Sequence, residues 1–247
     1  MSPSCIFQPA SADEVSRALK ILIAGQCQFA IKSGGHMPIL GANNIDDGIT
    51  IDLGWLNQTI LSPDRSFVSL GAGNTWLNAY RNLAADEVAF PGGVCGTTGV
   101  GGVSLGGGES LFQPRVGWVV DNVLNYEIVL ASGEVAIVNE TKYPDLYKAL
   151  KGGGSNFGIV TRVDVAVFDQ GDMWAGQIVV PAFSKTIERA LLATTAFIEQ
   201  NNMNPNAGLQ TAFINFANGT RVINFGFSST DGAINPDILR TFTMMQP

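Results

Sequence analysis

The chain has 247 residues, 46% of them apolar, and a formal net charge of −7. This length and composition allow one large or two ordinary domains with a substantial hydrophobic core. The acidic balance and the absence of any run of Lys or Arg in the sequence argue against nucleic acid or an anionic membrane as a partner.

The N-terminal part of the sequence alternates strands and helices. Ser11 and Glu14 match the capping box of a helix that ends near Ala24. The strand–helix–strand order of the first 35 residues predicts a parallel pair crossed by a helix, in an α/β layer. The expected elements are a strand over 5–8, the helix with its apolar stripe of Val15, Leu19 and Leu22, strands over 29–32, 49–53 and 67–70, and a helix capped by Asn74 or Thr75 that ends near Ala85.

The helix after residue 75 and the segments that follow it complete the first domain. We interpret Trp76 and Tyr80 as core residues on a buried helix face that also includes Leu77 and Leu83. The next expected elements are a strand, a turn at 131–134 and a second strand over 119–138, a helix over 144–150 that begins at Pro144, and a strand over 159–168.

The character of the sequence changes after about residue 171. The pattern predicts a strand over 173–180, a helix over 184–199 with Ile187, Leu191, Thr194 and Ile198 in line, strands over 209–216 and 221–227, and a helix from Pro236. Three strands and about one and a half helices leave a sheet face and an edge uncovered. We therefore expect a domain over 1–170 and an incomplete α+β domain with an antiparallel sheet over 171–247.

Cysteine and histidine are too few for a metal site or a disulfide framework. The cysteines are Cys5, Cys27 and Cys95, and the single histidine is His36. Their spacing matches no common zinc pattern, so we expect no metal. Cys5 and Cys27 flank one predicted helix, and both a disulfide and a reduced pair are compatible with the sequence.

Targeting signals are weak. The first twenty residues include charged side chains and therefore lack the apolar core of a signal peptide and the length of a membrane span. Sequons at Asn57, Asn139 and Asn218 suit a secreted protein, although such short patterns also arise by chance. Localisation and oligomeric state stay open.

Glycine is concentrated in one stretch. Residues 92–108 hold nine of the 29 glycines and no charged group. Glycine at this density allows positive φ and close approach of the backbone to a ligand. A flexible linker is the alternative, but linkers are polar, whereas valine and leucine are interleaved here.

Three further glycine turns lie at 34–35, 71–73 and 152–158. The Rossmann G-x-G-x-x-G fingerprint and the P-loop Gly-Lys pair are absent from the sequence, which excludes those nucleotide sites. Backbone N–H groups in glycine turns can still bind phosphate without cationic side chains. Lys32 is the only cation within reach of the first turn.

Several motifs occur together in a characteristic order. They are SGGH at 33–36, Gly48-Ile-Thr-Ile-Asp-Leu53, Cys95-Gly-Thr-Thr-Gly-Val-Gly-Gly102, Leu105-Gly-Gly-Gly108 and Gly153-Gly-Ser-Asn-Phe-Gly-Ile-Val-Thr161. The sequence over about 5–170 thereby resembles the FAD-linked oxidases with a vanillyl-alcohol-oxidase-type (PCMH-type) FAD domain. Within these it is most similar to the berberine bridge enzyme-like oxidases, which include fungal sugar and secondary-metabolite oxidases.

The resemblance implies an α+β fold of α/β layers, with a two-subdomain FAD domain followed by the start of an antiparallel-sheet substrate domain. It implies that Ser33–His36 grips the FAD pyrophosphate, that residues in 93–102 form a second wall, and that Gly158–Val160 meets the adenine or ribitol end. The candidate cofactor-binding residues are Lys32, Ser33, Gly34, Gly35, His36, Gly93, Cys95, Gly96, Thr97, Thr98, Gly99, Gly101, Gly102, Gly158, Ile159 and Val160.

The same resemblance implies covalent attachment of the flavin. In the family the histidine of SGGH is often bonded to the 8α-methyl carbon, and in bicovalent members a cysteine at the position of Cys95 is bonded to C6. Neutral imidazole and thiolate are both nucleophiles, which suits this role. The alternatives are a surface or capping histidine at His36 and a small buried thiol at Cys95.

The activity that the resemblance implies is oxidation of a small molecule by hydride transfer to FAD, with oxygen as the acceptor. In the family, the catalytic base comes largely from later segments, so no base is named and we expect weak or no turnover from this chain. The alternatives are a truncated FAD-binding remnant and a glycine-rich binding module without flavin, such as one that recognises carbohydrate.

Overall fold

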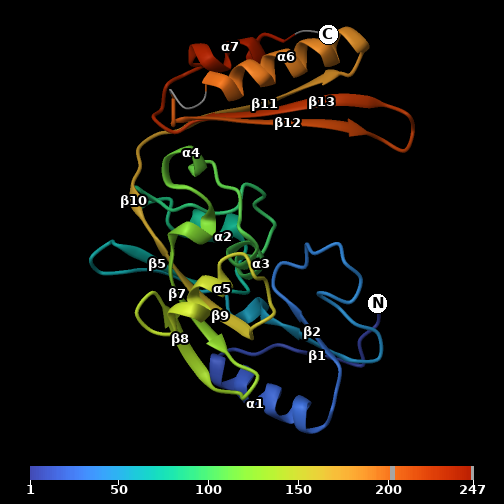
Figure 1. The fold of residues 1–247 in the computed structure, drawn as a ribbon, viewed down its shortest axis with the longest axis vertical. Helices are drawn as coiled ribbons and strands as arrows, with labels where there is room; N and C mark the ends of the chain where they lie inside the picture. Colours follow the sequence, from blue (N-terminus) through green and yellow to red (C-terminus); the bar gives the residue numbers. More distant parts are fainter. Residues whose placement is uncertain (201–203, 246–247) are drawn as a thin grey trace. The chain divides into compact units, whose positions relative to one another are not determined.

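The computed structural model describes residues 1–200 and 204–245. The chain forms two compact units, Met1–Asp169 and Gln170–Pro247. Figure 1 traces their strands and helices along the chain. Each unit has its own hydrophobic core. Both units combine helices with sheets, and the expected α+β class is confirmed.

A small parallel sheet begins the first unit, with the strand order β1-β3-β2. Its elements are β1 (Cys5–Phe7), α1 (Ala12–Ala24), β2 (Phe29–Lys32) and β3 (Ile49–Asp52). Ser11 caps α1 by accepting a hydrogen bond from the N–H of Glu14 at 3.2 Å. The predicted parallel crossover is correct in direction, but β3 lies between β1 and β2 and pairs with both.

The largest sheet of the first unit has five antiparallel strands in the order β4-β5-β9-β7-β8. They are β4 (Thr59–Leu61), β5 (Phe67–Gly71), β7 (Val123–Val129), β8 (Val135–Asn139) and β9 (Ile159–Ala166). The short strands β6 (Val88–Ala89) and β10 (Phe168–Asp169) pair separately. Residues 119–122 form a 3-10 turn, so the strand that was predicted to start at 119 starts at 123.

The helices of the first unit are α2 (Trp76–Asn82), α3 (Val100–Gly106), α4 (Gln113–Val116) and α5 (Pro144–Leu150), with a further 3-10 turn at Leu53–Trp55. Thr75 caps α2 by accepting from the N–H of Asn78 at 3.4 Å. This helix ends at Asn82, earlier than predicted. Its buried face includes Ala79, whereas Leu77, which was predicted to be buried, is 39% exposed.

The helix α3 lies inside the glycine-rich stretch, where the sequence predicted no helix. Glycine costs about 1 kcal/mol relative to alanine in a helix interior. Val100 and Leu105 are buried in the core of the unit, and α3 contacts β5 and β9. Burial of these two side chains therefore offsets the low helix propensity of the segment.

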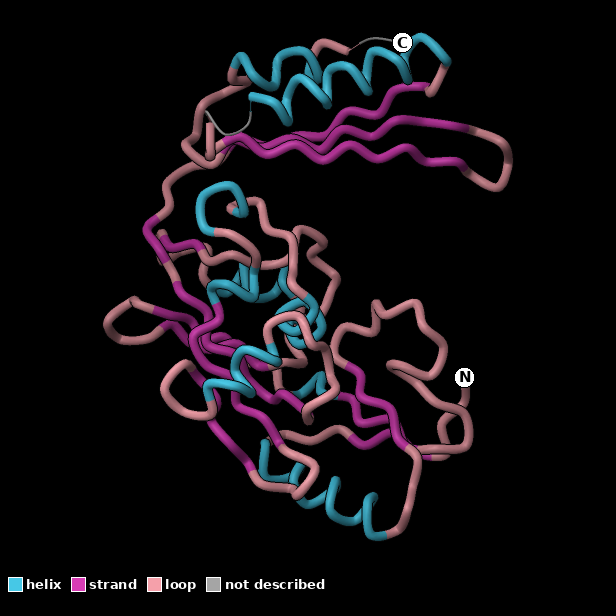
Figure 2. The backbone as a smooth tube through the Cα atoms, in the orientation of Figure 1, coloured by secondary structure: helices cyan, strands magenta, loops and turns pink. Residues whose placement is uncertain are grey.

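The second unit is a three-stranded antiparallel sheet in the order β11-β13-β12 with two helices. Its elements are β11 (Trp174–Pro181), α6 (Ser184–Gln200), β12 (Ala207–Asn215), β13 (Arg221–Ser229) and α7 (Asp237–Thr243). Figure 2 shows both helices on the same face of the sheet. The stripe predicted for α6 is partly wrong: Leu191 and Ile198 are exposed, and Ala190 and Phe197 are buried instead.

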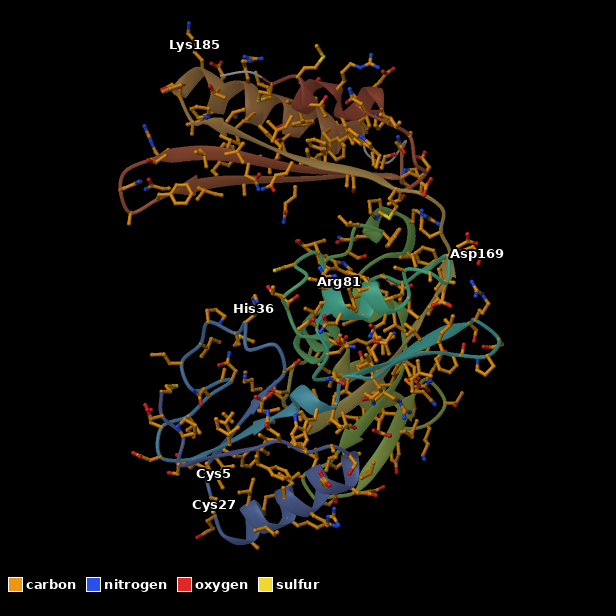
Figure 3. The ribbon with its side chains drawn as sticks, turned by 180° about the vertical axis from the view of Figure 1, so that it is seen from behind. Cys5, Cys27, His36, Arg81, Asp169 and Lys185 are labelled. Carbon is orange, nitrogen blue, oxygen red and sulfur yellow. The ribbon has the colours of Figure 1, made fainter. Side chains whose placement is uncertain are left out.

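The thiols of Cys5 and Cys27 are free and exposed, so the structure has the reduced form of the pair (Figure 3). Among the described residues, no helix combines the length and apolar character that crossing a membrane requires.

Candidate functional site

The Ser33–His36 turn follows β2 and lies directly against the glycine-rich stretch. The Ser33 hydroxyl donates a hydrogen bond to the carbonyl of Ala72 at 2.5 Å. A Cβ on Gly34 would stand 2.2 Å from the nitrogen of Gly99, and a Cβ on Gly99 would stand 2.2 Å from the nitrogen of Gly34. Glycine is therefore required on both sides of this contact, which holds the two motifs together.

The backbone of the same turn offers free hydrogen-bond donors. Gly35 has a φ of +73°, in the left-handed region that favours glycine. Within the described part of the chain, the N–H groups of Gly34, Gly35 and His36 have no protein acceptor. Successive N–H groups around a left-handed residue form a concave anion-binding nest. The turn can therefore accept a phosphate without a cationic side chain.

The helix α3 presents bare backbone on the side opposite its buried residues. A Cβ on Gly102 or on Gly106 would have no neighbour within 4 Å. Both glycines line the same cavity as the Ser33–His36 turn. A flat ligand can therefore approach the α3 backbone closely.

The third glycine segment completes the wall. The N–H of Gly154 donates to the carbonyl of Leu105 at 3.0 Å, which ties the segment to the end of α3. Gly158 has a φ of +150°, and a Cβ there would stand 2.5 Å from the carbonyl oxygen of Val129. This backbone path leads into β9 and brings Ile159 and Val160 to the cavity.

The three segments enclose a cavity of about 360 Å³. The predicted cofactor residues that line it are Ser33, Gly34, Gly35, His36, Thr98, Gly99, Gly101, Gly102, Gly158, Ile159 and Val160. The other candidates, Lys32, Gly93, Cys95, Gly96 and Thr97, do not line it.

Several lining residues were not among the candidate cofactor residues, although Leu53, Leu105, Gly106, Gly154 and Ser155 lie inside the quoted motifs. They are Ile31, Met37, Pro38, Ala42, Asn43, Leu53, Val103, Leu105, Gly106, Gly154 and Ser155. Most of them are apolar and flank a glycine motif within a few positions. Adjacency to the motifs is the signal that could have found them, because the turns bring their immediate neighbours to the same wall.

Lys32, a candidate cofactor residue, lies outside the cavity lining and forms an ion pair. Its Nζ forms an ion pair with Oδ2 of Asp52 at 3.0 Å, and Oδ1 of Asp52 accepts from the N–H of Gly54 at 3.1 Å. The charge expected for the pyrophosphate is thus already paired with a carboxylate. This leaves backbone amides as the main anion donors of the cavity.

The two candidate attachment residues differ in position. His36 is exposed at the cavity, in the loop that follows β2 (Figure 3). Cys95 is also exposed, and its Sγ lies 3.4 Å from the hydroxyl oxygen of Thr97. The hydrogen bond from the Thr97 side chain lowers the pKa of Cys95 because it stabilises the thiolate.

A cavity of this kind, in which glycine turns take the place of basic side chains, suits a dinucleotide held through backbone amides in a protein of α+β architecture. The chain belongs to the FAD binding domain family, whose profile matches residues 3–139. It is 48% identical over 176 residues to the FAD-dependent monooxygenase prx3 of Penicillium roqueforti, a match that covers 71% of this chain and 34% of that protein. The chain therefore spans about a third of this relative.

Solved structures show the same fold. The 6-hydroxy-D-nicotine oxidase of Arthrobacter nicotinovorans has a TM-score of 0.81 and 26% identity, over 96% of this chain and 52% of that one. The glucooligosaccharide oxidase of Acremonium strictum, which carries a 6-S-cysteinyl, 8α-N1-histidyl FAD, has a TM-score of 0.81 and 22% identity, over 97% of this chain and 51% of that one.

The residues present fit FAD. The donors of the Ser33–His36 turn suit a pyrophosphate, and side chains at Gly102 or Gly106 would fill the space that a ligand needs. The cavity walls are mainly apolar, as expected for a site that holds an aromatic cofactor.

Proposed function

We propose that this protein is an FAD-dependent oxidoreductase that oxidises an alcohol-type C–H bond of a small molecule, a sugar or a secondary metabolite. The proposal includes hydride transfer to a covalently bound flavin and oxygen as the acceptor. Its main support is the convergence of three glycine segments and His36 on one cavity. The matching relatives are named as FAD-dependent monooxygenases and oxidases.

In this proposal the N–H groups of Gly34, Gly35 and His36 hold the pyrophosphate, and the α3 backbone at Gly102 allows close approach of the cofactor. When bound, FAD supplies the acceptor for the hydride. The protein binds and orients the cofactor.

His36 and Cys95 are the proposed attachment residues. Each attachment is a net two-electron oxidation: the side chain loses its N–H or S–H hydrogen, the flavin carbon loses a hydrogen, and oxygen leaves as hydrogen peroxide. Support comes from the place of His36 at the cavity and from the lowered pKa of Cys95, which favours the nucleophilic thiolate.

A second candidate function is FAD binding without turnover. It is favoured by the lining of the described cavity, in which His36 is the only titratable side chain, so that the cavity accounts for cofactor binding and offers no further acid or base. Oxygen consumption against a panel of sugars and alcohols separates the two. Incorporation of labelled oxygen into a product would favour a monooxygenase, whereas hydrogen peroxide without incorporation favours an oxidase.

The test of flavin attachment uses protein purified from a flavin-replete host and then denatured. Yellow fluorescence that stays with the polypeptide supports covalent FAD. We expect it to persist in His36→Ala and in Cys95→Ala and to be lost when both changes are combined. Loss of the fluorescence already in His36→Ala would show that His36 is the single tether and that Cys95 is not bonded to the flavin. A colourless preparation of the unchanged protein would refute the proposal in favour of a binding module without flavin.

A further inference from the structure

The segment that carries Cys95 is fastened to α2 by backbone hydrogen bonds. The N–H of Leu77 donates to the carbonyl of Gly96 at 2.9 Å, and the N–H of Trp76 donates to the carbonyl of Thr98 at 3.2 Å. The hydroxyl of Thr98 also donates to the carbonyl of Cys95 at 2.6 Å. The chain is thus fixed directly after Cys95.

A side chain of the same helix fixes the chain before Cys95. The hydroxyl of Tyr80, one turn further along α2, donates to the carbonyl of Gly93 at 3.1 Å. Burial raises the pKa of Tyr80, so the phenol stays protonated and remains a donor at any working pH. Because this hydrogen bond comes from a side chain, a substitution at Tyr80 can remove it.

Packing gives the segment a single path. Trp76, Tyr80 and Phe90 form an aromatic cluster with ring centroids 5.2 to 6.3 Å apart. A Cβ on Gly92 would stand 2.4 Å from the Trp76 ring and 2.5 Å from the Tyr80 hydroxyl, and one on Gly93 would stand 2.7 Å from the Trp76 ring. The two glycines therefore leave no room for a side chain beside the aromatic cluster, and the hydroxyl of Tyr80 holds the Gly93 carbonyl.

From this geometry we infer that Tyr80 is a positioning residue, which sets the place of the Cys95 thiol through the Gly93 carbonyl. The inference rests on the proposed attachment at Cys95 and goes beyond it, because Tyr80 does not line the cavity. The sequence alone favoured a purely packing role for Tyr80. A packing role requires the ring, whereas the positioning role requires the hydroxyl.

The experiment compares Tyr80→Phe with Tyr147→Phe. Both keep the ring and remove one hydroxyl that donates to a backbone carbonyl, since Tyr147 donates to Val123 at 2.5 Å, away from the Cys95 segment. The holoproteins are digested, and the fraction of flavin linked to the Cys95 peptide is measured by mass spectrometry. We expect Tyr80→Phe to lower this fraction about two- to tenfold, the range for loss of one hydrogen bond. The fraction of flavin linked to His36 should stay unchanged, and the Tm of Tyr80→Phe should equal that of Tyr147→Phe.

A second measurement uses apoprotein in which Cys5 and Cys27 are changed to serine. The rate of Cys95 alkylation by iodoacetamide should change at least about twofold in Tyr80→Phe and stay constant in Tyr147→Phe. An unchanged protein without any Cys95-linked flavin would contradict the proposed second tether, and the alkylation rates would still decide the role of Tyr80. Equal linkage and equal alkylation in both variants would overturn the inference.

Discussion

Gly102→Ala separates the needs of the fold from the needs of the cofactor. Gly102 is inside α3, has no strained φ, and a Cβ there would meet no atom within 4 Å. Alanine should therefore stabilise the apoprotein by about 0.5–1 kcal/mol, which corresponds to a Tm increase of about 1–4 °C for a chain of this size. The added methyl group enters the cavity, where a ligand that contacts the backbone would collide with it.

Overpacking of this kind costs about 1–3 kcal/mol, so the affinity for FAD should fall about 5- to 150-fold. Apoprotein from a flavin-depleted host is titrated with FAD by fluorescence, and the Tm is measured by calorimetry. Gly171→Ala is the matched control, since its Cβ is equally free and lies outside the cavity. An affinity within twofold of the unchanged protein would refute the proposed approach of the cofactor to α3.

Three further predictions concern the neighbouring contacts. Gly34→Ala forces a Cβ against the Gly99 backbone, and we expect a loss of about 1–3 kcal/mol and a Tm lower by about 2–12 °C; an unchanged Tm in calorimetry would contradict the contact. Lys32→Met removes a cation that is paired with a carboxylate, so FAD affinity should change less than about threefold in the same titration. A tenfold loss of affinity would indicate that Lys32 binds the phosphate. Because a hydrogen bond from Thr97 lowers the pKa of Cys95, Thr97→Val should shift the pH midpoint of Cys95 alkylation upward, and an identical midpoint would exclude that bond as the cause.

Local signals in the sequence predicted the elements that depend on local chemistry. The capping box at Ser11 and the proline at the start of α5 located two helices, because caps and N-terminal prolines act within one turn. The helix α3 was missed, since its stability comes from burial of Val100 and Leu105 rather than from propensity. The exposed Leu191 of α6 shows the same limit, because tertiary packing decides which face of a helix is buried.

Most of the glycines predicted for the site line the cavity, whereas Gly93, Gly96 and Lys32 do not. The contact between Gly34 and Gly99 follows from motifs that are far apart in sequence but specific together. Lys32 was assigned to the cofactor because it directly precedes the Ser33–His36 turn. In the structure it forms an ion pair with Asp52 on the neighbouring strand β3. Pairing between strands of this kind cannot be read from the local pattern.

The most direct test of the account is the flavin content of His36→Ala combined with Cys95→Ala, purified from a flavin-replete host. If backbone amides hold the cofactor and the two side chains only tether it, this variant should be yellow in the native state, with about one FAD per chain, and should release all of it on denaturation. A native preparation without flavin, at FAD concentrations that saturate the unchanged protein, would contradict the central claim that the glycine segments form the binding site.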